Sequence, residues 1–112
     1  MDFIRVYTGE DGAAHFEPVE GDLADAWAKG VPATQCAIRT MAPGTTMDWH
    51  PAPQRQVVIH LSGQIEIGLR DGATHLFGPG SARLMDDVTG TGHLTRVVGS
   101  EPVVQVIIRL PQ

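Results

Sequence analysis

The sequence has little of several residue types, and each shortage excludes a class of protein. It has one cysteine, Cys36, so no internal disulfide can form and a reducing compartment is expected. No apolar run approaches the roughly 18 residues that would span a bilayer, and the start at Met1 lacks the pattern of a signal peptide. We therefore expect a soluble, cytoplasmic protein with no membrane partner.

Basic residues are also few, and they are dispersed. The chain has a single lysine, Lys29, and its formal net charge is −5. The seven arginines occur singly from Arg5 to Arg109, whereas binding to a phosphate backbone needs a concentrated basic face. The sequence therefore predicts that nucleic acid is not a partner.

Turn-forming residues, in contrast, are plentiful. Thirteen glycines and eight prolines divide the 112 residues into short segments, which is typical of many tight turns and few helices. Strand-like patterns occur at 3–7, 14–18, 34–41, 47–50, 54–61, 64–69, 74–77, 82–85, 93–98 and 103–110. Only residues 22–29 have the composition of a short helix, with Asp22 as a possible cap. We predict one all-β domain over residues 1–112, with two antiparallel sheets packed as a barrel or jelly roll.

Two histidine-containing segments have an informative spacing. The first is Gly44-Thr-Thr-Met-Asp-Trp-His50, followed by Gln56 and Gly63, and the second is Gly90-Thr-Gly-His93. They resemble the first cupin motif, Gly-x5-His-x-His-x3-Glu-x6-Gly, and the end of the second, Gly-x5-Pro-x-Gly-x2-His-x3-Asn. The chain is similar to small cupins from about residue 31 to 110. This resemblance independently implies a jelly-roll barrel and a binding site inside it.

The first motif is incomplete, which bears on metal binding. Ala52 stands where the motif has its second histidine, and Gln56 stands where it has glutamate, so His50 and His93 are the two expected ligands that remain. Two imidazoles and an amide oxygen can still hold a divalent ion such as iron, manganese, zinc or nickel. The alternative is a metal-free pocket whose histidines are hydrogen-bonded to neighbours.

Strand alternation extends the predicted pocket beyond these ligands. Side chains two residues apart share a face, so Asp48 is expected beside His50, and His60 on the same face as Gln56. The predicted pocket comprises Asp48, His50, Gln56, His60 and His93. His60 could instead be a hydrogen-bonded core histidine, since it lies between two apolar residues.

The sequence also suggests roles for two adjacent carboxylates and for the cysteine. Asp86 and Asp87 precede the loop to His93, and one of them could orient its ring, although adjacent carboxylates are more often solvated. Cys36 alternates with Ile38 and is expected in the core.

Arginines are candidates for binding an anionic substrate at the mouth of the pocket. These candidates are Arg39, Arg55, Arg83 and Arg96. Arg55 and Arg96 are out of phase with the expected ligands, which favours surface or interface roles for these two.

The resemblance also bears on assembly and function. Cupins are commonly homodimers, and Val57, Ile59 and Leu61 alternate with the pocket residues, so they could form the surface of such a dimer. Cupins include dioxygenases, lyases and isomerases as well as members without known activity, so the fold alone does not assign a reaction. Three hypotheses follow: a metal-dependent pocket that acts on a small molecule, a metal-free small-molecule-binding protein, and a structural dimer without catalytic activity.

Overall fold

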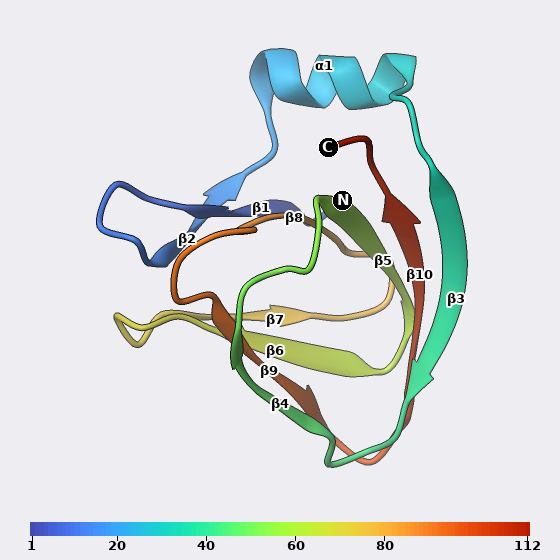
Figure 1. The fold of residues 1–112 in the computed structure, drawn as a ribbon. Helices are drawn as coiled ribbons and strands as arrows, with labels where there is room; N and C mark the ends of the chain where they lie inside the picture. Colours follow the sequence, from blue (N-terminus) through green and yellow to red (C-terminus); the bar gives the residue numbers. More distant parts are fainter.

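The computed structural model describes residues 1–112 as two facing β-sheets with one helix above them (Figure 1). The elements are β1 (Phe3–Thr8), β2 (Ala14–Pro18), α1 (Gly21–Lys29), β3 (Gln35–Met41), β4 (Thr46–His50), β5 (Gln56–Ser62), β6 (Gln64–Gly68), β7 (Thr74–Phe77), β8 (Ala82–Asp86), β9 (His93–Val98) and β10 (Val103–Arg109). Six strands form one sheet in the order β2-β1-β8-β5-β10-β3, and four form the other in the order β4-β9-β6-β7. The predicted all-β jelly roll and its one short helix are confirmed.

One pairing departs from the predicted antiparallel sheets. β1 runs parallel to β8, with Phe3 opposite Ala82 and Tyr7 opposite Asp86. A parallel pair needs a long connection between its strands, and β1 and β8 are separated by most of the chain. The N-terminal strand can therefore enter the six-stranded sheet next to β8 in this direction.

The core lies between the two sheets. β6 and β7 contribute Ile65, Ile67 and Phe77, all with no exposed surface, and β5 and β10 contribute Val58 and Ile107 from the opposite side. Alternation along β6 places its two isoleucines on the inner face. Fully burying side chains of this size contributes roughly 1.5–3 kcal/mol each, so this interior holds the sheets together.

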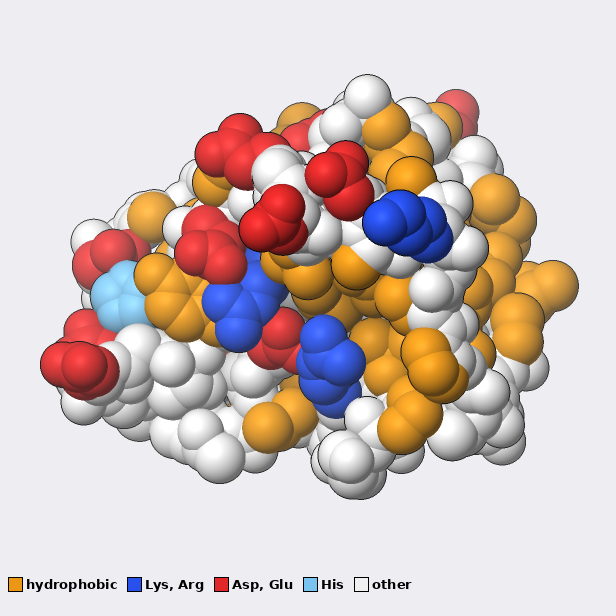
Figure 2. Space-filling view, turned by 90° about the horizontal axis from the view of Figure 1, so that it is seen from above, with side chains coloured by type: hydrophobic (Ala, Val, Ile, Leu, Met, Phe, Trp, Pro, Cys, Tyr) orange, Lys and Arg blue, Asp and Glu red, His pale blue; other side chains and the backbone are white.

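The outer face of the six-stranded sheet is apolar and partly open. Cys36 and Ile38 of β3 are both exposed, Ile38 to 73%, which corrects the expectation that Cys36 lies in the core. Alternation had placed the two residues on one face, but that face points outward. Leu61 of β5 is 53% exposed on the same side, and Figure 2 shows hydrophobic side chains exposed beside and below the helix.

α1 covers part of this outer face. Trp27 meets Phe3 of β1 edge-on, with ring centroids 5.6 Å apart, yet the helix has no buried residue. The helix ends at Gly30, whose φ of 115° ends the helical run and whose N–H bonds to the carbonyl of Ala26. No helix of the structure has the length and apolar character that crossing a membrane would require.

Candidate functional site

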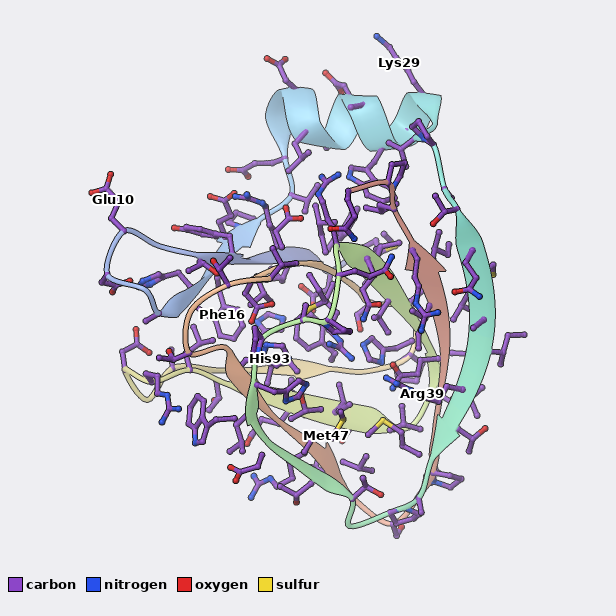
Figure 3. The ribbon with its side chains drawn as sticks, viewed as in Figure 1. Glu10, Phe16, Lys29, Arg39, Met47 and His93 are labelled. Carbon is purple, nitrogen blue, oxygen red and sulfur yellow. The ribbon has the colours of Figure 1, made fainter.

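A polar pocket of about 200 Å³ opens between the two sheets. β4 and β9 line one wall, the other sheet lines the opposite wall, and the segment after β4 closes one side. Its lining residues are Met47, His50, His93 and Thr95; Arg39, Gln56, Arg83, Met85, Ile107 and Arg109; and Pro51, Ala52 and Pro53. In Figure 3, Arg39, Met47 and His93 point into the space between the sheets, whereas Glu10 and Lys29 point away from it.

His50 and His93 meet on neighbouring strands. His50 ends β4, His93 begins β9, and the two residues are directly paired in the sheet, with ring centroids 4.8 Å apart. Gly92 makes this approach possible, because it has a φ of +73° and a Cβ added there would overlap the carbonyl group of His50. The structure therefore brings together the two histidines that the motifs singled out.

The Nδ1 atom of each ring is engaged, which fixes the ring orientations. Nδ1 of His93 lies 2.5 Å from Oδ2 of Asp87, and both side chains are buried. Nδ1 of His50 lies 2.6 Å from the backbone carbonyl oxygen of Asp48, and since a carbonyl only accepts, this nitrogen carries the proton. Nε2 is the remaining nitrogen on each ring, and it has no protein hydrogen-bond partner.

The five predicted pocket residues do not all meet. His50, Gln56 and His93 line the pocket, whereas Asp48 is exposed and His60 lies behind the pocket wall, 1% exposed. The placement of Asp48 corrects the alternation argument. The register between β4 and β9 shifts between Met47 and His50, so Met47 takes the inward position and the Asp48 carboxylate accepts the N–H of Trp49.

The adjacent carboxylates Asp86 and Asp87 have separate roles. Asp87 is fully buried and orients His93, while Asp86 receives the Nε–H of Arg5 at 2.7 Å and of Arg55 at 2.6 Å. Only one of the two therefore serves the pocket.

Arg83 lies at the floor of the pocket and is 4% exposed. Its guanidinium donates to Nε2 of His60 at 3.2 Å and to Oε1 of Gln105 at 3.5 Å, and both acceptors are neutral. Arg39 donates to the same Gln105 oxygen, also at 3.5 Å. Gln105 therefore holds two guanidinium groups next to each other at one side of the pocket.

The arginines that line the pocket differ from the other four in their partners. Arg5 and Arg55 form ion pairs with Asp86, and Arg96 pairs with Glu66. Arg70 lies over the ring of Trp49, with Cζ 3.9 Å from the centroid. Neither Arg39 nor Arg83 has a carboxylate partner, and Arg109 bonds only to the side-chain oxygen of Gln35.

Burial lowers the pKa of three basic side chains at or beside the pocket, Arg83, Arg39 and His60. It lowers the pKa of Arg83 to about 10, helped by repulsion from Arg39 and opposed by attraction to Asp87, so Arg83 stays protonated at neutral pH. The pKa of Arg39 is lowered too, by burial and by repulsion from Arg109. Burial, with Arg83 as a second cause, lowers the pKa of His60 to about 3. A neutral His60 can accept a hydrogen bond from the Nε–H of Arg83 at its Nε2, while its Nδ1 is buried without a hydrogen-bond partner.

The sequence analysis identified part of the arginine cluster of the pocket, which consists of Arg39, Arg83 and Arg109. Arg39 and Arg83 were among the candidates for anion binding and line the pocket, whereas Arg55 and Arg96, for which surface or interface roles were expected, form ion pairs and do not line it. Arg109 was not recognised as a pocket residue. One feature of the sequence could have identified it: Arg109 and Gln105 are four residues apart and therefore share one face of an otherwise apolar strand. Polar residues on one face of a core strand indicate a polar site in the interior.

Comparison with solved structures identifies the fold. The chain is similar to a Silicibacter pomeroyi protein described as a sugar phosphate isomerase from a cupin superfamily. The identity is 17% and the TM-score 0.56, and the match covers 99% of this chain and 70% of that one. A cupin domain from Bordetella pertussis is 19% identical with a TM-score of 0.54, over 69% of this chain and 80% of that one. A Streptococcus pyogenes protein of unknown function is 18% identical with a TM-score of 0.51, over 69% of this chain and 64% of that one. No family model and no curated protein matches the sequence. The fold is that of a small cupin.

Proposed function

We propose that this small cupin-fold protein binds a small organic anion in the pocket between its sheets. The observation that carries the proposal is that the three arginines lining the pocket have no carboxylate partner, while the other four are paired or stacked. Removing a charged group from water is costly unless an opposite charge compensates it. Arg83 is nearly fully buried and has only neutral acceptors, so a negatively charged ligand supplies the missing counter-charge.

The lining of the pocket is suited to a ligand of this kind. Arg39, Arg83 and Arg109 can form short, charge-assisted hydrogen bonds to carboxylate or phosphate oxygens. Met85 and Ile107 offer apolar surface for a short carbon skeleton, and the volume of about 200 Å³ limits the ligand to a few carbon atoms. The similar isomerase from Silicibacter pomeroyi is named for a phosphorylated sugar, and such a substrate would also supply negative charge.

The proposal predicts a difference in affinity between anions and related neutral molecules. Calorimetric titration at fixed ionic strength would compare succinate with succinamide, and glycerol 3-phosphate with glycerol. We expect at least one of the anions to bind with a Kd of about 1 mM or lower, and the neutral molecules to give no measurable binding. Binding of the neutral molecules with equal affinity, or of none of the four, would contradict the proposal.

A second candidate function is a divalent metal site at His50, Gln56 and His93. The observation in its favour is that both imidazoles have Nδ1 engaged and Nε2 without a protein partner, and a carboxylate behind a metal-binding histidine is a common arrangement. The donor set fits a dication only in part, because no group of three or more His, Cys, Asp and Glu side chains converges anywhere in the structure. If bound, iron, manganese, zinc or nickel would act as a Lewis acid toward the ligand.

The incomplete donor set predicts that metal binding depends on the anion. Untagged protein incubated with Zn²⁺ and then desalted is expected to hold well under one equivalent of metal, and to hold more when succinate is included. His93→Ala should abolish this increase, whereas His75→Ala, which removes an imidazole bonded to Asp2 outside the pocket, should not. Elemental analysis measures the metal. Equal metal content in wild type and His93→Ala would eliminate this candidate.

A second copy of the chain is the proposed protein partner. The outer face of the six-stranded sheet exposes Ile38 and Leu61, and a hollow of about 350 Å³ beside α1 is lined only by apolar residues, Val57 and Ile59 among them. Apolar surface of this kind is stabilised when a partner removes it from water. Light scattering of the purified protein tests this, since a mass near 12.0 kDa would show a monomer.

A further inference from the structure

We infer that the ligand of this pocket is a dianion: a compact molecule with two negative charges, as in a phosphate monoester or a short dicarboxylate. This inference rests on the proposed binding of an anion and specifies the chemical class of the ligand. It follows from the number of charged groups that face the pocket, and from their arrangement.

The charged side chains of the pocket come from both sheets. The six-stranded sheet supplies Arg39 from β3, Arg83 from β8 and Arg109 from β10. The four-stranded sheet supplies His50 and His93, and the segment after β4 supplies only Pro51, Ala52 and Pro53. No Asp or Glu lines the pocket; the carboxylate to be counted against the arginines is Asp87, which is fully buried behind His93, is bonded to its ring and attracts Arg83. Positive charge therefore exceeds negative charge by two, before any charge on the imidazoles is counted.

The excess charge is clustered and not spread around the walls. Arg39 and Arg83 each donate to the same oxygen of Gln105, so their guanidinium groups are neighbours. Arg109 follows on the adjoining strand, where it repels Arg39. A singly charged ligand would compensate one of these groups and leave the others repelling each other. A dianion would bridge them, because a phosphate monoester has three terminal oxygens and a dicarboxylate has four.

The opposite wall does not provide a competing anion. On that wall Thr95 of β9 offers only a hydroxyl, and Gln56, which pairs in register with Arg109 on the arginines' own sheet, is neutral. The exposed carboxylate of Asp48 is turned away from the pocket by the register shift in β4. Nothing on that side can satisfy the second positive charge, so the ligand itself must do so.

Matched ligand pairs that differ by one charge test the inference. Calorimetric titration at pH 8 and fixed ionic strength would compare succinate with succinamate, and glycerol 3-phosphate with its singly charged phosphate methyl ester. We expect the doubly charged member of at least one pair to bind about tenfold tighter or more, as electrostatic complementarity at a desolvated site requires. The pair with the larger ratio identifies the source of the charge as carboxylate or phosphate.

Variants test whether the ratio of affinities for the doubly and singly charged ligands depends on the arginine cluster. In Arg39→Gln and in Arg109→Gln, the preference for the dianion should fall to about twofold or less, because one of the compensated charges is gone. Arg96→Gln is the control, since Arg96 pairs with Glu66 outside the pocket, and its ratio should equal that of the wild type. Equal affinities for both members of each pair would overturn the dianion inference while leaving anion binding intact. Failure of every anion to bind would overturn the proposed function as well.

Discussion

Arg83→Met is expected to abolish anion binding and, at the same time, to raise the stability of the ligand-free protein. The guanidinium of Arg83 is buried without a carboxylate partner, and replacing a buried charge by an apolar side chain of similar length commonly stabilises a fold. We expect the free energy of unfolding to increase by about 1–2 kcal/mol. Affinity for the tightest-binding anion should fall about 100-fold or more, since a desolvated counter-charge is lost.

Two measurements separate a binding role for Arg83 from a structural one. Thermal or urea unfolding reports stability, and calorimetry with the same anion reports affinity. Arg96→Met removes a surface arginine whose ion pair with Glu66 contributes about 1 kcal/mol or less, so it should change neither quantity appreciably. A marked loss of stability in Arg83→Met with affinity preserved would show that the guanidinium serves the core through His60 and Gln105, and would remove the main support for the anion proposal.

Gly92→Ala is expected to destabilise the protein by about 3 kcal/mol or more and to separate the two pocket histidines. The added Cβ would overlap the carbonyl group of His50, and the residue would also have to adopt a φ of +73°. Neither His50 nor the loop from Gly90 can shift freely, because Ala52 bonds to the carbonyl of Asp87 and Thr91 to that of Gly12. Urea unfolding measures the cost.

Gly80→Ala is the matched control for this substitution. Gly80 has a φ of +84°, but a Cβ added there would meet nothing within 4 Å, so only the backbone conformation is penalised. That penalty is about 1–2 kcal/mol. The difference between the two variants isolates the steric contact at His50, and equal costs would mean that the strands relax to admit the methyl group. Anion binding should weaken only in Gly92→Ala.

Turn chemistry explains why the elements could be predicted from the sequence. The prolines and glycines that separate the apolar segments correspond to the ends of strands in the structure, so most predicted strands agree with the observed ones within a few residues. The parallel pairing of β1 with β8 was not predicted, because a local pattern contains no information on which distant strand becomes a neighbour. Cys36 shows a related limit: alternation groups residues by face, but it does not say which face is inward.

The pocket was predicted where a spacing motif specified it, and less well where alternation alone was used. His50, Gln56 and His93 line the same pocket, as the motif spacing indicated. Asp48 does not, because the register shift in β4 changes the alternation, and one sequence carries no visible mark of it. Arg109 was not among the predicted pocket residues, although it lies on the same inward face of β10 as Gln105 and Ile107.

The strand order has a consequence for synthesis on the ribosome. β3 pairs with β10, joining Gln35 to Arg109, and β1 pairs with β8, so both ends of the six-stranded sheet depend on residues far along the chain. The β1–β8 contacts must wait until β8 has emerged from the exit tunnel and the β3–β10 contacts until β10 has, while the hairpin of β6 and β7 can form earlier. The three pocket arginines lie on β3, β8 and β10, so they come together only after β10 has emerged, and their mutual repulsion then opposes closure of the sheet.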